Sequence, residues 1–186
     1  MPTDTAAIRT LLQSYQDLYR ARDVARLDEA MKLFVPDEQV EMVGTEAVQR
    51  GGPDWALGHD GVRALTEWDW RYWLEVELDV AGARVAVDGA VAWVTLAGAL
   101  VQSERGREGT CAFVRQTSLA WLRRTLADEE QTLEQRLVAV AQVAAARARE
   151  LQAPVGHRWA LTFWAVLVRR DDAWLFHTTH WALAAE

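Results

Sequence analysis

The sequence has little cysteine, no long apolar run and no surplus of positive charge. Its single cysteine, Cys111, excludes an intramolecular disulfide framework and a cysteine-based zinc site. The net charge of -7 argues against a nucleic-acid partner, because such binding depends on Lys and Arg side chains that neutralise phosphates. No apolar run approaches the roughly 20 residues that a membrane span needs. We therefore expect neither a nucleic-acid nor a membrane partner.

Several short catalytic motifs are also missing from the sequence. There is no H-E-x-x-H or comparable metal-ligand spacing, no glycine-rich phosphate loop and no G-x-S-x-G turn. The first residues do not show a basic segment followed by an apolar one, which a signal peptide would have. We accordingly expect no metal, no cofactor and a cytoplasmic location.

Tryptophan, in contrast, is abundant, with ten residues in a chain of 186. This length predicts one domain with room for one elaboration. Tryptophan is large, and its ring N–H needs a partner when it is buried. So many of them indicate either a large aromatic core or an aromatic-lined cavity, and the sequence leaves both open.

Three helices are predicted in the first 73 residues, because apolar residues recur there every three or four positions. The first covers 4–21 and can be capped by Asp4 or Thr5. The second covers 24–34 and ends before Pro36. The third runs from about 59 or 60 to 73, with Asp60 as its candidate cap.

Antiparallel strands are predicted for most of the remainder. A short strand at 39–43 precedes a loop at 46–58 that carries Trp55. Residues 75–80 alternate acidic and apolar, as a half-buried strand does, and 84–87 continue them. Asp88 and Gly89 form a hairpin signal before a strand at 90–102, and a polar loop is expected at 103–109. Residues 157–184 form two apolar runs joined by a polar turn at 169–172.

The segment from about 115 to 153 interrupts this pattern with residues that favour helices. We predict one long helix from Asp128, its candidate cap, to Gln152, preceded by a shorter helix. It is either a surface helix packed on its own domain, a lid over a pocket or an oligomer contact.

Helices followed by antiparallel strands indicate an α+β fold. The final two strands are apolar on both faces, so both faces of their sheet must be covered. The N-terminal helices can cover one face. The other needs the helical insertion or a partner chain, so we expect a homodimer through the outer face of the sheet.

The order of elements and several short matches resemble the nuclear transport factor 2-like superfamily, and within it the SnoaL-like domains. The matches are G-H-D-G-V-R at 58–63, D-G-A-V-A-W-V at 88–94, and the ending from Arg158 to Ala182, where Trp174 and His180 match the family's Trp and His. The ending differs from the family pattern at two positions. Ala182 stands where a polar residue is common, and Thr178 stands where a second histidine can occur.

This resemblance implies a single domain over 1–186 with a helical insertion at about 115–153. It implies a cone-shaped, curved, mainly antiparallel sheet closed on one side by three N-terminal helices, with a pocket in its mouth. Members include isomerases, dehydratases, cyclases and kinase-association domains, so the fold does not select one function.

The last strand carries the first candidate catalytic residue, His180. Even positions from Trp174 to Ala182 share one face of a strand, and we expect that face to look into the cone. His180 is then a candidate general acid or base, or a structural histidine bonded to a backbone carbonyl. Asp69 on the third helix is its candidate carboxylate partner, or a helix-edge residue that pairs with Arg63 or solvent.

Other polar and aromatic side chains complete the expected pocket. The hydroxyl groups of Tyr15 and Tyr19 either stabilise an oxyanion or belong to the core. His59 is either an exposed loop residue or a ligand contact. The full expected lining is Tyr15, Tyr19, Trp55, His59, Trp73, Trp93, Trp174, Phe176 and Thr178.

Two functions follow from this pocket. The first is binding of an apolar or aromatic small molecule, with cofactor-free lyase or isomerase chemistry. The second is a non-enzymatic dimerisation or ligand-binding module whose aromatic residues form a plain core. A cavity of roughly 300 Å³ or more would favour the first.

Overall fold

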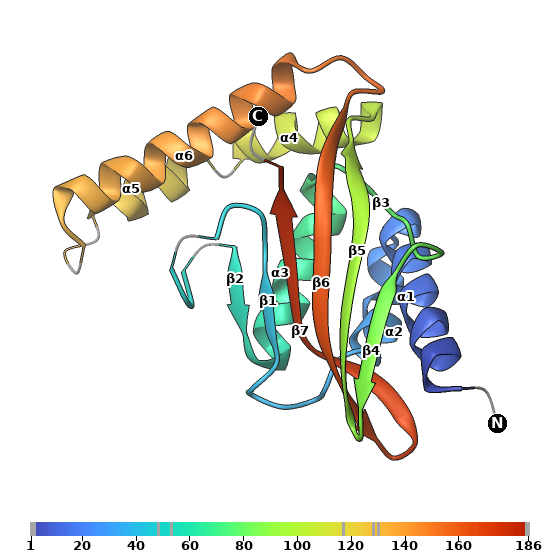
Figure 1. The fold of residues 1–186 in the computed structure, drawn as a ribbon. Helices are drawn as coiled ribbons and strands as arrows, with labels where there is room; N and C mark the ends of the chain where they lie inside the picture. The colour runs from blue at the N-terminus through green and yellow to red at the C-terminus, as the bar shows by residue number, and fades with distance from the viewer. Residues whose placement is uncertain are drawn as a thin grey trace.

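The computed structural model describes residues 3–47, 49–52, 54–116, 118–127, 129 and 131–184. A curved, seven-stranded sheet runs through the molecule, and helices pack against it (Figure 1). The expected α+β class is confirmed.

The N-terminal helices form where the apolar spacing predicts them. They are α1 (Asp4–Ala21), a short 3-10 helix (Val24–Arg26) with α2 (Leu27–Met31), and α3 (Gly58–Tyr72). Thr3 caps α1, since its side chain accepts the N–H of Ala6, so the cap lies one residue before the expected Asp4. Asp60 lies inside the first turn of α3 and does not cap it.

The sheet has the strand order β2-β1-β7-β6-β5-β3, with β4 also paired to β5. Strands β1 and β7 run parallel, and the other pairs are antiparallel. The segment expected as a loop at 46–58 contains β2, which pairs with β1. The strands are β1 (Glu41–Val43), β2 (Trp55–Leu57), β3 (Glu75–Leu78), β4 (Arg84–Asp88), β5 (Val91–Val101), β6 (Arg158–Arg170) and β7 (Ala173–Leu183).

A two-residue turn joins β6 to β7. Asp171 and Asp172 both have positive φ, 48° and 64°, which this kind of tight hairpin requires at its two central residues. Asp tolerates that conformation better than most residues do. The polar turn expected at 169–172 is therefore present, with Arg169 and Arg170 as the last residues of β6.

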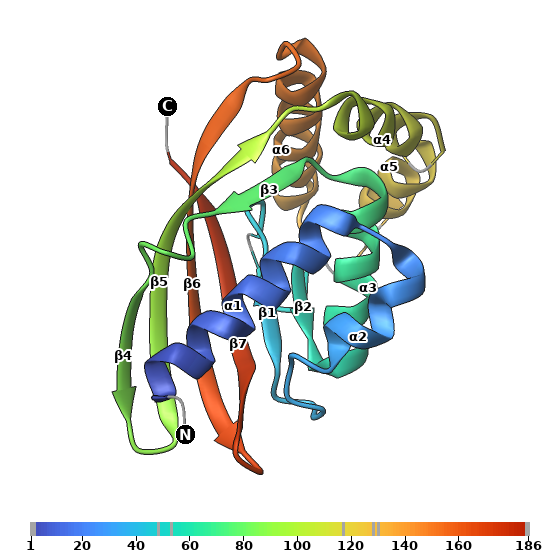
Figure 2. The same cartoon turned by 90° about the vertical axis from the view of Figure 1, so that its right-hand side faces the viewer.

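The two faces of the sheet differ. Helices α1, α2 and α3 cover one face (Figure 2), and the aromatic core lies between them and the sheet. No helix of the described chain covers the opposite face of β5 and β6, where Trp93 is 49% and Trp164 is 38% exposed. We call this face the outer face.

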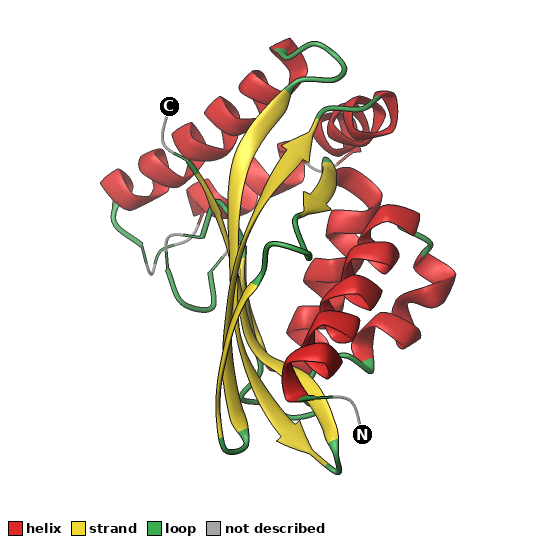
Figure 3. Ribbon diagram, turned by 45° about the vertical axis from the view of Figure 1, so that its right-hand side comes forward, coloured by secondary structure: helices red, strands yellow, loops and turns green. Residues whose placement is uncertain are grey.

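Three helices lie between β5 and β6, at one end of the sheet (Figure 3): α4 (Glu104–Gln116), α5 (Ser118–Ala127) and α6 (Leu133–Gln152). We call them the insertion, and they begin before the expected residue 115. The expected loop at 103–109 is wrong. Ser103 accepts the N–H of Gly106 and starts α4 there. Gly109 then lies against the backbone of Tyr72, where a Cβ would meet main-chain atoms at 3.0 Å, so glycine allows α4 to pack on α3.

Helix α6 begins later than the expected residue 128. Thr132 accepts the N–H of Gln135, and the Gln135 side chain accepts the N–H of Thr132, which is a capping box. Asp128, the expected cap, lies outside the described residues.

Among the helices of the described residues, none is both long enough and apolar enough to cross a membrane.

Candidate functional site

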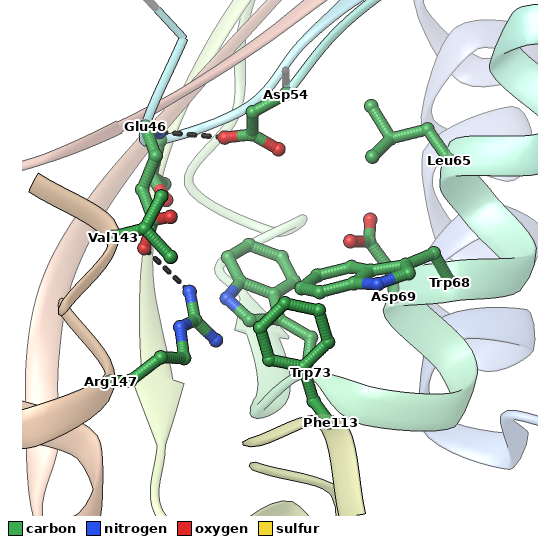
Figure 4. A pocket seen from close by; sticks show the side chains of 10 residues that line it. Glu46, Asp54, Leu65, Trp68, Asp69, Trp73, Phe113, Val143 and Arg147 are labelled. Atoms are coloured by element: carbon green, nitrogen blue, oxygen red, sulfur yellow. Dashed lines mark hydrogen bonds and ion pairs between the residues drawn. The ribbon is translucent and has the colours of Figure 1, made fainter. Parts of the chain in front are cut away.

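A cavity of about 210 Å³ lies between α3, the loop after β1, and the inserted helices α4 and α6. Figure 4 shows an aromatic side facing a polar one across it. The lining residues are Thr45, Glu46, Asp54, Leu65, Trp68, Asp69, Trp73, Phe113, Val143 and Arg147. The insertion therefore contributes to the cavity wall.

Helix α3 supplies one aromatic ring, that of Trp68, and one carboxyl group. Trp68 and Asp69 follow Leu65 by three and four residues, so all three project from one side of the helix. The end of α3 is held by Arg22, whose guanidinium donates to the carbonyl oxygens of Asp69, Trp70 and Trp73. This anchor fixes the position of the last turn and of the Asp69 side chain.

The carboxyl group of Asp69 is enclosed, since the residue is only 6% exposed. Tyr19 donates its hydroxyl proton to Asp69 Oδ2 at 3.0 Å. Burial raises the pKa of Asp69 well above the usual range, and the nearby charge of Asp54 raises it further. The environment therefore favours the neutral, proton-carrying form of Asp69.

Asp54 brings a second carboxyl group to the cavity from the loop before β2. Its backbone is left-handed, with φ of 63°. Its Oδ2 accepts the backbone N–H of Glu46 at 2.6 Å, and its carbonyl oxygen accepts the N–H of Gly44 at 2.7 Å. Burial raises the pKa of Asp54 to about 7, while the Glu46 N–H and the Arg147 charge act in the opposite direction. Asp54 is therefore poised to exchange a proton near neutral pH.

Arg147 of α6 is the one guanidinium among the described lining residues. It is 6% exposed, and it forms ion pairs with Glu46 at 2.6 Å and Glu150 at 2.8 Å. Its guanidinium also lies 5.8 Å from the ring centroids of Trp68 and Phe113. These contacts attach α6 to the cavity wall.

Two of the sequence-predicted residues, Asp69 and Trp73, line the cavity. Tyr19 does not line the cavity, but its hydroxyl group forms a hydrogen bond to Asp69, which does. Tyr15 is wholly buried in the aromatic core, where it packs on Phe34, Phe163, Phe176 and Trp181.

A bulge in β7 changes the expected pattern of faces. The register shifts at His177, which has no partner on β6 although the residues on both sides of it are paired. An extra residue reverses the alternation of side chains beyond it. The expectation that even positions look toward the helices is therefore right for Trp174 and Phe176, which are buried, and wrong for Thr178 and His180.

His180 lies on the outer face, so it does not meet Asp69. It pairs with Trp164 across the strands, and the two rings are 4.9 Å apart. Burial lowers the pKa of His180. Thr179 and Trp181 occupy the helix-covered face in its place.

Three more of the expected lining residues lie elsewhere. Trp93 is on the outer face. The ring N–H of Trp55 donates to Glu41 Oε2 at 3.0 Å on the β1–β2 pair. His59 Nε2 lies 3.3 Å from the carbonyl oxygen of Met31 and borders a separate, more open hollow near α2.

Sequence reasoning missed Asp54, Glu46 and Arg147. The glycine-rich loop before β2 gave no sign that one of its carboxyl groups turns inward. Arg147 is one of many charged residues in the insertion, and nothing in its spacing distinguishes it from the others. Among the described residues, no group of three or more His, Cys, Asp or Glu side chains is arranged to hold a metal ion.

Comparison with solved structures identifies the fold. A putative dehydratase of the NTF2-like family from Streptomyces avermitilis has a TM-score of 0.58 at 12% identity, with 99% of this chain and 98% of that chain covered. An NTF2-like protein with a cystatin-like fold from Novosphingobium aromaticivorans has a TM-score of 0.55 at 14% identity, with 97% and 81% covered.

A cystatin-like protein of unknown function from Nostoc punctiforme has a TM-score of 0.57 at 8% identity, with 100% and 95% covered. No protein-family model and no curated protein matches the sequence. The chain thus has the nuclear transport factor 2-like, cystatin-like fold that its sequence resemblance predicted.

Proposed function

We propose that the cavity binds a small molecule with an apolar body and acts on it by cofactor-free acid–base catalysis, as a lyase or isomerase does. The observation that carries this proposal is the pairing of Asp54 and Asp69 in one cavity. Burial raises the pKa of Asp54 to about 7 and that of Asp69 well above its usual range, so the pair can supply both a base and a proton-carrying acid.

In this proposal Asp54 is the base. Its carboxylate removes a proton from a carbon next to a carbonyl group, while the neutral Asp69 donates its proton to an oxygen of the substrate. If that oxygen is a hydroxyl group on the neighbouring carbon, the C–H and C–O bonds break, a C=C bond forms and water leaves. If it is the carbonyl oxygen, an enol forms instead. One proton is taken and one is given in either case.

The aromatic walls support this assignment. Trp68, Trp73 and Phe113 reduce contact between the carboxyl groups and water, so the acid and base act in a medium of low polarity. Tyr19 holds Asp69 in place through its hydrogen bond. The volume of about 210 Å³ does not reach the roughly 300 Å³ that would favour small-molecule binding, so the proposal requires a small substrate.

Proton exchange in D₂O tests the catalytic part without knowledge of the natural substrate. The protein is incubated with small ketones and hydroxy ketones, some of which carry an amino group, and NMR follows loss of the C–H signal next to the carbonyl. We expect enzyme-dependent exchange that rises as the pH passes through about 7, where Asp54 ionises. Asp54→Asn should slow the exchange by about 10²–10⁴-fold.

The Asn side chain tolerates the left-handed backbone at position 54, so the variant should fold. Equal exchange by wild type and Asp54→Asn would contradict the role of Asp54. Native mass spectrometry of freshly purified protein distinguishes the enzyme from a non-enzymatic binding module. A binding module would retain a small molecule but would not catalyse exchange in any member of the panel.

We also propose that the chain forms a homodimer through its outer face. The exposed rings of Trp93 and Trp164 support this, because aromatic side chains are enriched at the centres of protein interfaces. The His180 ring lies beside that of Trp164 on the same face, tilted by 50°, and extends the aromatic surface.

A further inference from the structure

Acidic side chains outnumber basic ones around the cavity. Three carboxyl groups line it, those of Glu46, Asp54 and Asp69, and Arg147 is the single guanidinium among the described lining residues. A fourth carboxyl group, that of Glu150, lies behind Arg147 and binds it. No basic group lining the described part of the cavity therefore remains to pair with Asp54 or Asp69.

Arg147 is already paired with two carboxylates. Its two terminal nitrogens are held by the carboxylates of Glu46 and Glu150, at 2.6 Å and 2.8 Å. Its remaining nitrogen, Nε, is buried and has no hydrogen-bond partner among the described residues, so a ligand cannot reach it. A ligand carboxylate would have to displace Glu46 and would then lie near Asp54 and Asp69.

Each of the two unpaired carboxyl groups keeps one oxygen for a ligand. Asp69 Oδ2 is occupied by the Tyr19 hydroxyl and Asp54 Oδ2 by the Glu46 N–H. Within the described chain, no hydrogen bond reaches the Oδ1 atom of either residue. Both side chains line the cavity, and Figure 4 shows the Asp69 carboxyl group directed into it. In the ionised form of each group this oxygen is an acceptor, and two acceptors facing one small space suit a donor with several N–H bonds.

The opposite wall is suited to positive charge. The faces of aromatic rings carry partial negative charge and attract cations. Two of these rings, Trp68 and Phe113, already attract a cation, since the Arg147 guanidinium lies 5.8 Å from each centroid. Trp73 adds a third aromatic side chain to the lining.

From these contacts we infer that the cavity selects a small primary ammonium ion on an apolar body, with the cationic nitrogen between Asp54 and Asp69 and the body against the aromatic wall. This inference names the ligand class of the proposed function. It rests on that function, because the cavity must bind a small molecule. An ammonium ion favours the charged form of the carboxyl groups beside it, so ligand binding releases protons from this pair.

The volume of the cavity limits the apolar part of each test ligand. A dry apolar cavity of about 150 Å³ can hold benzene. The present cavity, of about 210 Å³, therefore has room for a benzyl-sized group and one polar substituent. Benzylammonium, benzyl alcohol and benzoate form a matched cation, neutral and anion series, and cyclohexylmethylammonium with its alcohol and acid forms a second.

Isothermal titration calorimetry of the whole protein with these two series tests the inference. We expect each ammonium ion to bind at least about tenfold more tightly than its alcohol, and the carboxylates not to bind. At about pH 6, where Asp54 is mostly protonated, ammonium binding should release protons in buffers of different ionisation enthalpy, whereas alcohol binding should release none.

Two variants and a control separate selectivity from folding. Asp54→Asn and Asp69→Asn keep the shape of each side chain, and each should reduce the preference for ammonium over alcohol to less than about threefold. Glu77→Gln removes a carboxylate that pairs with Arg158 on the surface, far from the lining residues, and should leave the preference unchanged.

The possible results are distinct. Alcohols that bind as tightly as the ammonium ions, or carboxylates that bind best, would overturn the inference while the proposed binding cavity stands. The same would follow if Asp54→Asn and Asp69→Asn kept the wild-type preference. If no member of either series binds at millimolar concentration, the inference and the proposed small-molecule cavity both fail.

Discussion

At the scale of single residues, Gly44 positions the candidate base. A Cβ built on Gly44 would fall about 2 Å from the carboxyl atoms of Asp54, which is closer than atoms can pack. Its backbone does not require glycine for φ, because it is not among the residues with positive φ. The absence of a side chain at position 44 therefore leaves the space that the Asp54 carboxyl group fills.

Gly44→Ala should move the Asp54 carboxyl group without unfolding the protein. The displaced atoms are the end of one side chain, so we expect the free energy of unfolding to change by less than about 1 kcal/mol. Proton exchange and ligand binding should nevertheless fall as far as they do in Asp54→Asn. Urea unfolding and the exchange assay measure the two effects.

Gly61→Ala is the matched control, since its new Cβ would meet only Ala56 at an ordinary 3.7 Å. It should stabilise α3 by about 0.5–1 kcal/mol and leave exchange unchanged. Full exchange activity in Gly44→Ala would show that the Asp54 side chain is not held as described.

At the scale of helices and strands, the sequence predicts whether a segment is a helix or a strand better than it predicts which way each side chain faces. Three-residue and four-residue apolar spacing is sufficient to locate α1 and α3, because it records which side of each helix is buried. The alternation in β7 predicts its faces only as far as His177. A bulge depends on how two strands match across a sheet, and no local pattern in one strand encodes it.

The candidate site follows the same division. Asp69 could be proposed from the sequence because it lies on a regular helix, but its expected partner, His180, lies on the outer face. Asp54 lies in a loop and Arg147 on an inserted helix, and each reaches the cavity through tertiary contacts that spacing does not report.

Helix α6 is attached to the cavity through the buried ion pairs of Arg147. Arg147→Leu would leave Glu46 and Glu150 without their partner, and the loss of one member of a buried pair costs about 3 kcal/mol. We expect a lower free energy of unfolding in urea and faster amide hydrogen exchange in α4 and α6, with little change in β5 and β6.

Arg149→Leu provides the comparison on the same helix. Arg149 is exposed, so its replacement should change stability by no more than about 0.5 kcal/mol. If the two variants are equally stable, the ion pairs do not hold the insertion in place.

At the scale of the whole molecule, the sheet has one covered and one uncovered face. Aromatic rings that are exposed on a sheet face favour a partner that covers them. Each Å² of apolar surface that is removed from water contributes about 25 cal/mol of favourable free energy. The proposed dimer would cover Trp93 and Trp164.

Trp164→Glu should shift the protein from dimer to monomer. Burying an unpaired charge at the centre of an interface opposes association, and loss of a central tryptophan alone often weakens binding by about 2 kcal/mol or more. Analytical ultracentrifugation over a range of concentrations measures the change. Leu137→Glu places the same charge on an exposed apolar site of α6, and it should leave the dimer intact. A wild-type protein that is monomeric at all concentrations would contradict the proposed interface.

The central claim is that one cavity holds two carboxyl groups whose pKa values are both raised by burial. Carbon-13 NMR of Asp side chains over a pH titration tests it most directly, with Asp54→Asn and Asp69→Asn to assign the two signals. The account predicts that Asp54 titrates with a pKa of about 7 and that the pKa of Asp69 is also raised well above the usual value. Titration of both groups near the ordinary Asp pKa of about 4 would contradict it.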